Sequence, residues 1–233
     1  MSSPSSANSP INSHPLDLRL YLVTDEQQCA PRSLVSVVQG ALDGGATLVQ
    51  LRDKTGSTRH MVDVARALLG ICHAAGVPLI INDRVDVAMA SGADGVHVGQ
   101  SDMLATDARR LLGPAAIVGV SVRTVQDARD AWRDGASYLG ASGIWSTATK
   151  TDVGEPLGLQ SLKQIIDATP LPVVAIGGIG TAQAPLIAQV GCHGIAVVSA
   201  IMKAPDPKLA AQSLRDAFHT ANTANTVNTV PRP

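Results

Sequence analysis

The sequence predicts a single (β/α)8 barrel, because apolar strand patterns alternate with helical patterns eight times between Asp17 and His219. A segment of roughly 200 residues lies near the small end of the size range for this fold. A doubly wound open sheet fits less well, since that fold carries a G-x-G-x-x-G loop after its first strand. Here the corresponding residues 23–28 read VTDEQQ. We therefore expect a closed parallel barrel.

The first half of the chain supplies four strands, each an apolar run followed by polar residues. Helical patterns separate the strands, and Gly44 and Gly76 end the first two of these helices. The expected strands are residues 18–23, 47–51, 79–81 and 96–98, and the expected helices are 33–42, 58–75 and a short amphipathic segment before Gly92. The polar residues after each strand are therefore expected at one end of the barrel.

The second half repeats this alternation. The expected strands are residues 116–120, 137–141, 172–176 and 194–198, and the expected helices are 102–112, 124–134, 159–168 and 208–219. A small pair precedes every even-numbered strand, beginning at Gly45, Gly92, Gly135 and Gly191. Small residues there let a helix end pack closely against the next strand, which supports the repeated unit.

The two ends of the chain differ in composition from the barrel at residues 17–219. Residues 1–16 are rich in Ser and Pro and lack the basic start and apolar centre of a secretory signal. A transit peptide should contain Arg, and the first one is Arg19. Residues 220–233 form a polar low-complexity tail with little surface to bury. We predict that both ends are disordered.

Composition narrows the class of function. Apolar residues make up 45% of the chain, aromatic residues 2%, and the net charge is −1 without a basic run. These values disfavour nucleic-acid binding, which needs basic and aromatic surface. No apolar run is long enough for a membrane span. Three widely spaced cysteines indicate free thiols in the cytoplasm. Small-molecule partners are therefore expected, and the sequence leaves a homo-oligomer open.

Two aspartates stand just beyond neighbouring strands. Asp83 follows the third strand and Asp102 the fourth, so both carboxylates should face one barrel mouth. Hard oxygen ligands without a His or Cys cluster favour Mg²⁺ over Zn²⁺. Each aspartate taken alone also suits a helix N-cap. Because they occur together at adjacent strand ends, we favour the metal site.

Cations and phosphate-binding turns complete the predicted mouth. Arg52, Lys54 and Lys150 bring positive charge to strand ends that also carry the acidic pair. This mixture suits a polyphosphate bound through Mg²⁺ and cationic side chains. The turns after the last two strands, at Gly177-Gly178 and Val198-Ser199, suit a separate monophosphate. His97, within an apolar run, is interpreted as an inward-facing, hydrogen-bonded histidine and not a catalytic base.

Seven short segments resemble one family when taken in order: YLVTD (21–25), VQLRDK (49–54), INDRVDVAMASGADGVHVGQSD (81–102), VGVS (118–121), TATKTD (147–152), AIGGI (175–179) and AVVSAI (196–201). Together they are similar to thiamine phosphate synthase. The resemblance implies a barrel transferase that joins 4-amino-2-methyl-5-(diphosphooxymethyl)pyrimidine to a 4-methyl-5-(phosphooxyethyl)thiazole, or its carboxylated form. Thiamine phosphate and pyrophosphate would be the products.

The resemblance also implies a role for individual residues. Asp83 and Asp102 match the family's Mg²⁺ ligands. The pyrophosphate contacts match Arg52, Lys54, Asn82 and Lys150, the pyrimidine side matches Gln50 and Ser121, and the thiazole phosphate site matches Thr147, Ala148, Thr149, Gly178, Val198 and Ser199. Lys150, Arg52 and Ser121 are the expected catalytic residues.

Chemistry then favours a dissociative substitution. Loss of pyrophosphate leaves a cation stabilised by the aminopyrimidine, and the thiazole nitrogen captures it without needing a general base.

The loop at residues 140–150 departs from the family by carrying Ser142, Gly143 and Ser146. Thiazole tautomerases share this barrel but use a histidine near position 143, which Gly143 does not supply. A non-catalytic phosphate-binding barrel would show a degraded mouth, whereas the acidic pair and the cations are intact.

Overall fold

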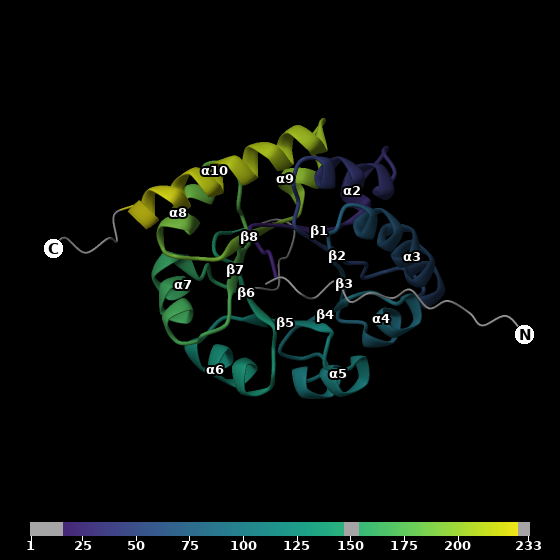
Figure 1. Ribbon diagram of the computed structural model, residues 1–233, viewed down its shortest axis with the longest axis horizontal. Helices are drawn as coiled ribbons and strands as arrows, with labels where there is room; N and C mark the ends of the chain where they lie inside the picture. The colour runs from purple at the N-terminus through teal and green to yellow at the C-terminus, as the bar shows by residue number, and fades with distance from the viewer. Residues whose placement is uncertain (1–15, 147–153, 228–233) are drawn as a thin grey trace, which may run out of the picture.

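The protein is a closed barrel of eight parallel strands in sequence order, β1 to β8, with β8 pairing back to β1 (Figure 1). The computed structural model describes residues 16–146 and 154–227. The strands are β1 Leu20–Val23, β2 Leu48–Leu51, β3 Leu79–Asn82, β4 Gly95–Val98, β5 Ile117–Val122, β6 Tyr138–Ser142, β7 Val173–Ile176 and β8 Gly194–Val197. The predicted fold class is confirmed.

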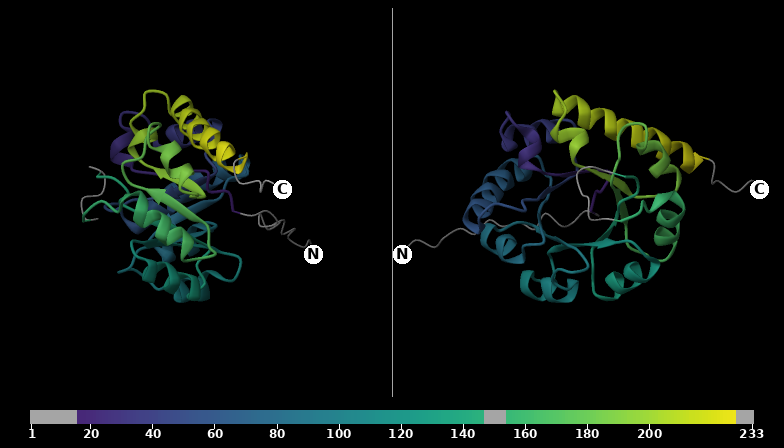
Figure 2. Two further views of the ribbon diagram at one scale, coloured as in Figure 1. Left: turned by 90° about the vertical axis from the view of Figure 1, so that its left-hand side faces the viewer. Right: turned by 180° about the vertical axis from the view of Figure 1, so that it is seen from behind.

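Helices form a ring outside the strands, seen from the front in Figure 1 and from the side and behind in Figure 2. They are α1 Glu26–Cys29, α2 Leu34–Asp43, α3 Thr58–Ala74, α4 Val85–Ser91, α5 Ala105–Leu112, α6 Val125–Arg133, α7 Gly158–Asp167, α8 Ala184–Gln189, α9 Ser199–Met202 and α10 Pro207–Val227. The last helix, α10, packs across α8 and α2 and so covers the outside of the barrel where β8 pairs with β1. In the described ranges, no helix combines the length and apolar character that a bilayer crossing requires.

Local side-chain chemistry explains several helix starts. Ser33 accepts a hydrogen bond from the Ser36 amide at the start of α2, and Ser57 accepts one from the His60 amide at the start of α3. At α6, Thr124 and Asp127 form a reciprocal capping box. Each of these side chains satisfies amide groups that the first helical turn leaves without partners.

The strands contribute side chains to two hydrophobic layers, one outside and one inside the barrel. Leu20 and Leu22 of β1 belong to the large cluster between strands and helices, whereas Tyr21 and Val23 belong to a small cluster inside the barrel. This alternation follows from the two-residue period of a strand. The lumen is therefore packed with side chains, and its polar members lie toward the end where the strands finish.

Some boundaries differ from the prediction. Helix α5 begins at Ala105 and not at residue 102, because the Asp102 amide bonds to the Gly99 carbonyl in a turn before the helix. Helix α10 continues past His219 to Val227. Its buried residues Leu214 and Phe218 hold the helix on the barrel, so the following residues extend a helix that already exists. The short helices α1, α8 and α9 were not predicted. Of the predicted leader at residues 1–16, residues 1–15 lie outside the described residues.

Candidate functional site

A pocket opens where the strands end, and each strand of the barrel contributes at least one residue to its lining. Its polar lining includes Gln50 from β2, Asn82 from β3, His97 from β4 and Ser121 from β5, with Arg52 directly after β2. Val23, Val174, Ile176, Ala196 and Val198 supply apolar walls. Five of the predicted site residues, Gln50, Arg52, Asn82, Ser121 and Val198, therefore line one pocket.

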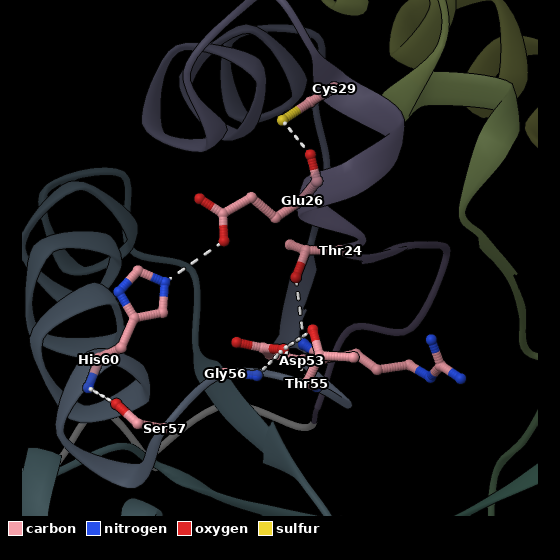
Figure 3. Close-up of polar contacts among 9 residues, drawn as sticks. Thr24, Glu26, Cys29, Asp53, Thr55, Gly56, Ser57 and His60 are labelled. Carbon is pink, nitrogen blue, oxygen red and sulfur yellow. Dashed lines mark hydrogen bonds and ion pairs between the residues drawn. The ribbon is translucent and has the colours of Figure 1, made fainter.

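The end of β1 holds the end of β2 in place beneath this pocket. Thr24 is fully buried and donates its backbone amide to the Gln50 carbonyl, at 2.9 Å. The Thr24 hydroxyl oxygen accepts a hydrogen bond from the Arg52 amide at 3.1 Å (Figure 3). The two contacts fix the backbone from which Gln50 and Arg52 project.

Asp83 forms the charged centre of the mouth. Its Oδ2 accepts hydrogen bonds from Lys54 Nζ at 2.5 Å and from Asn82 Nδ2 at 2.6 Å. Its backbone amide donates to the His97 carbonyl at 2.8 Å, which ties the residue to β4. Asp83 has φ of 61°, a left-handed conformation that is uncommon for a residue with a side chain and occurs often at functional sites.

Asp102 sits in the corresponding turn after β4. Its Oδ2 accepts a hydrogen bond from the Gly99 amide at 2.8 Å. The N-cap of α5 is Leu104 and the N-cap of α4 is Arg84, neither with a side-chain capping bond. The helix-cap interpretation of Asp83 and Asp102 is therefore wrong, and both carboxylates instead occupy turns after neighbouring parallel strands.

A row of buried hydrogen bonds crosses the lumen below the pocket. Gln50 Nε2 donates to the Tyr21 hydroxyl, and the Tyr21 and Tyr138 hydroxyls lie 2.9 Å apart. His97 Nδ1 is 2.8 Å from the Tyr138 hydroxyl, and His97 Nε2 is 2.9 Å from Ser121 Oγ. Burial raises the pKa of both tyrosines well above the ordinary value, so both phenols stay protonated. The prediction of an inward-facing, hydrogen-bonded His97 is confirmed.

Sequence reasoning missed the two tyrosines in this row. They are two of the very few aromatic residues in the chain, and each stands at an inward position of its strand. A buried tyrosine normally finds a partner for its hydroxyl, so a pair of them in a barrel lumen is the signal that was available.

A second, more open pocket lies beside the mouth and was also not predicted. Glu26, Asp53 and His60 bring ligand atoms within 4.8 Å of one another there, and Arg52 and Lys54 line the same pocket (Figure 3). His60 Nε2 is 3.4 Å from Glu26 Oε2. Burial raises the pKa of Asp53, but hydrogen bonds from the Thr55 and Gly56 amides outweigh it and leave that pKa lowered. We call these three residues the rim cluster; it is the one group of three potential metal ligands among the residues that the structure describes.

The turns after β7 and β8 lie side by side at the mouth. Gly177 has φ of 113° and Gly178 has φ of 67°, so both need the freedom of glycine. A Cβ on Gly178 would also lie 2.8 Å from the Ser146 carbonyl oxygen. Val198 is the N-cap of α9, and Ser199 is its first residue. The predicted monophosphate residues Gly178, Val198 and Ser199 are thus neighbours.

Arg123 holds the base of the loop after β6. Its Nη1 donates to the Ser142 carbonyl at 2.9 Å and its Nη2 to the Glu155 carbonyl at 2.6 Å. Gly143 within that base has φ of 77°. The predicted residues Thr147, Ala148, Thr149 and Lys150 lie outside the described residues.

Comparison with known proteins gives one consistent result. The family described as Thiamine monophosphate synthase matches residues 20–201. A thiamine-phosphate synthase of Roseiflexus castenholzii is 50% identical over 197 residues, which cover 84% of this chain and 86% of that protein. A thiamine-phosphate synthase of Chloroflexus aurantiacus is 50% identical over 202 residues, covering 87% and 93%. The solved thiamine phosphate pyrophosphorylase of Pyrococcus furiosus superposes with a TM-score of 0.81 at 37% identity, covering 89% of this chain and 98% of that one.

Proposed function

Because this chain belongs to the thiamine monophosphate synthase family, we propose that the barrel mouth carries out that family's reaction with the residues described above. The reaction is an alkyl transfer. It joins 4-amino-2-methyl-5-(diphosphooxymethyl)pyrimidine to 4-methyl-5-(phosphooxyethyl)thiazole, or its carboxylated form, and yields thiamine phosphate and pyrophosphate. The observation that carries the assignment of the site is the Lys54–Asp83–Asn82 contact at the edge of the pocket that contains Gln50 and Ser121.

Mg²⁺ fits the acidic pair. Asp83 and Asp102 offer hard oxygen ligands after neighbouring strands, and neither is used as a helix cap. When bound, Mg²⁺ would neutralise charge on the departing pyrophosphate. The rim cluster includes a histidine, a ligand that suits transition metals better than Mg²⁺, which makes it a less suitable Mg²⁺ site.

Cationic side chains bind the diphosphate. Lys54 has three N–H donors, so it can keep its contact with Asp83 while donating to a phosphate oxygen. Arg52 lines both pockets and offers a planar fork that matches two phosphate oxygens. Asn82 holds the Asp83 carboxylate in place, and we assign Lys150 to the same diphosphate from the resemblance alone.

The lumen pocket suits the pyrimidine ring. Its apolar walls can contact both faces of a flat ring, while Gln50 and Ser121 offer polar atoms at the edge. The thiazole phosphate is assigned to Gly178, Val198 and Ser199, where the first turn of α9 leaves amide groups without helical partners. Thr147, Ala148 and Thr149 join that site in the proposal.

These residues perform the reaction mainly by charge stabilisation and positioning. The bond between the pyrimidinylmethyl carbon and the diphosphate oxygen breaks first, and both electrons leave with pyrophosphate. Arg52 and Lys54 stabilise the developing negative charge. The thiazole nitrogen, held nearby through its phosphate, then forms the new C–N bond. No proton has to be removed from that nitrogen, so the site needs no general base.

We also assign the enzyme to the cytoplasm. All three cysteines, Cys29, Cys72 and Cys192, are free and buried. Burial raises the pKa of Cys72 and of Cys192 to about 12, which keeps these thiols protonated and unreactive. Buried free thiols are typical of proteins from reducing compartments.

The decisive test supplies purified protein with both substrates and Mg²⁺. We expect release of one pyrophosphate for each thiamine phosphate formed. Absence of both products would overturn the proposed function. Isomerisation of a thiazole carboxylate phosphate without pyrophosphate release would instead identify a tautomerase, although Gly143 has no side chain for that proton transfer.

A further inference from the structure

We propose that His97 is a positioning residue that sets the direction of the Ser121 hydroxyl, so that the pocket presents a hydrogen-bond donor at Ser121 and an acceptor at Gln50. This inference rests on the proposed function and extends it to specificity. The row of hydrogen bonds from Gln50 through Tyr21, Tyr138 and His97 to Ser121, here called the lumen relay, would select a ring that carries both an amino group and an acceptor nitrogen.

The barrel makes room for this relay at two glycines. A Cβ on Gly119 of β5 would lie 2.4 Å from the Tyr138 hydroxyl oxygen and 2.5 Å from His97 Nδ1. A Cβ on Gly140 of β6 would lie 2.9 Å from His97 Cε1. Any other residue at these positions would displace the relay, so the backbone of two strands is adapted to the His97–Tyr138 pair.

The proton directions follow from the donor at one end. Gln50 donates an amide N–H to the Tyr21 oxygen, so the Tyr21 proton is left to donate to Tyr138. The Tyr138 proton then goes to His97 Nδ1. With Nδ1 acting as acceptor, neutral His97 carries its proton on Nε2 and donates it to Ser121 Oγ. The Ser121 proton is consequently available to the pocket.

Burial makes this order persistent. Tyr21 and Tyr138 are 1% and 0% exposed, and Gln50 and His97 are 3% and 8% exposed, so exchange of hydrogen-bond partners with bulk water is restricted. The His97 and Tyr138 rings pack with centroids 5.5 Å apart, which limits rotation of the imidazole. In a low-dielectric lumen, reversing the row would require every member to exchange its donor and acceptor roles together.

The relay thus gives the pocket a fixed pattern of donor and acceptor. Gln50 uses its N–H on Tyr21, and its amide oxygen can accept from an exocyclic amino group. Ser121 can donate to a ring nitrogen. A site built to hydrogen-bond a substrate group rejects an analogue that lacks it, because a buried polar atom would lose its partner.

The first test uses two substitutions of His97 that keep different halves of its hydrogen bonding. His97→Gln places an amide near the former Nε2 and can still donate to Ser121, whereas His97→Asn reaches only toward Tyr138. Coupling rates are measured with the natural pyrimidine diphosphate and with deaza analogues in which one ring nitrogen is replaced by C–H. We expect the wild-type protein to prefer the natural ring by about tenfold or more over the analogue that lacks the nitrogen facing Ser121. This factor corresponds to the loss of one buried hydrogen bond.

In His97→Asn that preference should fall toward one, while the KM for the thiazole phosphate is unchanged. His97→Gln should recover most of the preference. Equal preference in all three proteins, or an equal change in the KM of both substrates, would overturn the proposal.

The second test does not depend on activity. ¹⁵N NMR of the ligand-free protein should find His97 neutral, with the proton on Nε2, and Tyr138→Phe should remove that tautomeric preference. A proton on Nδ1, or an imidazolium at neutral pH, would refute the relay even in an active enzyme. Conversely, an Nε2 proton in a protein that releases no pyrophosphate would refute the proposed function and leave the relay intact.

Discussion

The two ends of the barrel use polar residues differently. At the end where strands begin, side chains are committed to the backbone: Asp94 accepts from the Leu79 amide at 2.8 Å and contacts His73 Nε2 at 3.0 Å. Arg109 likewise donates to the carbonyls of Gly135 and Ala116, both at 2.9 Å. At the opposite end, Arg52 lines both pockets of the mouth, Lys54 lines one of them, and Asp83 forms an ion pair with Lys54. The contrast indicates that the first end contributes stability and the second end contributes chemistry.

The sharpest test of this comparison is Asp83→Ala. Removing the proposed metal ligand should lower the coupling rate by about 100-fold or more, because charge on the leaving group is no longer stabilised. Binding of the diphosphate should weaken far more than binding of the thiazole phosphate, as measured by calorimetry with each substrate. Equal losses for both substrates would show that the assignment to two separate phosphate sites is wrong.

Among substitutions at the end where the strands begin, Arg109→Ala should cause the largest loss of stability. It leaves several carbonyl groups and the Ser137 hydroxyl without their donor, so the free energy of unfolding should fall by about 2–3 kcal/mol. The matched control is Arg110→Ala on the same helix, whose exposed ion pair with Asp107 should be worth no more than about 0.5 kcal/mol. Urea unfolding gives both values. A large loss of activity in folded Arg109→Ala protein would contradict the division between the two ends.

Arg123→Lys probes the mouth more mildly. A lysine keeps the charge but cannot hold the Ser142 and Glu155 carbonyls with one planar group. The base of the β6 loop should loosen, and the KM for the thiazole phosphate should rise by about threefold to tenfold, the equivalent of one hydrogen bond. Steady-state kinetics with each substrate in turn measure this effect. A change in KM for the pyrimidine substrate alone would show that the β6 loop supports the diphosphate site and not the thiazole phosphate site.

The smallest expected effect is a pH dependence at the strand-start end. Burial raises the pKa of Asp17, but hydrogen bonds from Arg19 outweigh it and leave that pKa lowered in the folded protein. The contribution to stability is therefore present above the unfolded pKa of about 4 and is lost as the pH falls through the lowered, folded pKa. Because the pair is substantially exposed, Asp17→Asn should cost at most about 0.5 kcal/mol at pH 7.

Unfolding curves of wild type and Asp17→Asn at pH 7 and pH 3 check this prediction. The difference between the two proteins should shrink at the lower pH. A difference that grows on acidification would mean that Asp17 is protonated more readily in the folded state than in the unfolded state.

The sequence was sufficient for the barrel and for the strand-end residues. Alternating patterns locate each strand, and parallel strands bring Gln50, Arg52, Asn82 and Ser121 to the same end. His97 was also interpreted correctly, since a histidine in an apolar run needs internal partners. These features depend on periodicity, which a linear sequence displays directly.

Other features depend on contacts between distant elements. The rim cluster combines residues from α1, the loop after β2 and α3, and no spacing in the sequence brings them together. The Asp102 turn looked like a helix start because an aspartate preceded a helical pattern, yet its carboxylate binds back to the Gly99 amide. The end of α10 was missed because Asn and Thr have weak helix preferences, which the packing of the upstream turns overrides.

In the proposed site the acidic pair, and not the rim cluster, holds the metal with the diphosphate. Electron paramagnetic resonance of Mn²⁺ as a probe for Mg²⁺, titrated in the presence of pyrophosphate, distinguishes the two locations. We predict that Mn²⁺ binds the wild-type protein and the Glu26→Gln control equally, and that Asp83→Asn and Asp102→Asn each weaken binding by about tenfold or more. Retained binding in both aspartate variants, with loss in Glu26→Gln, would place the metal at the rim cluster instead.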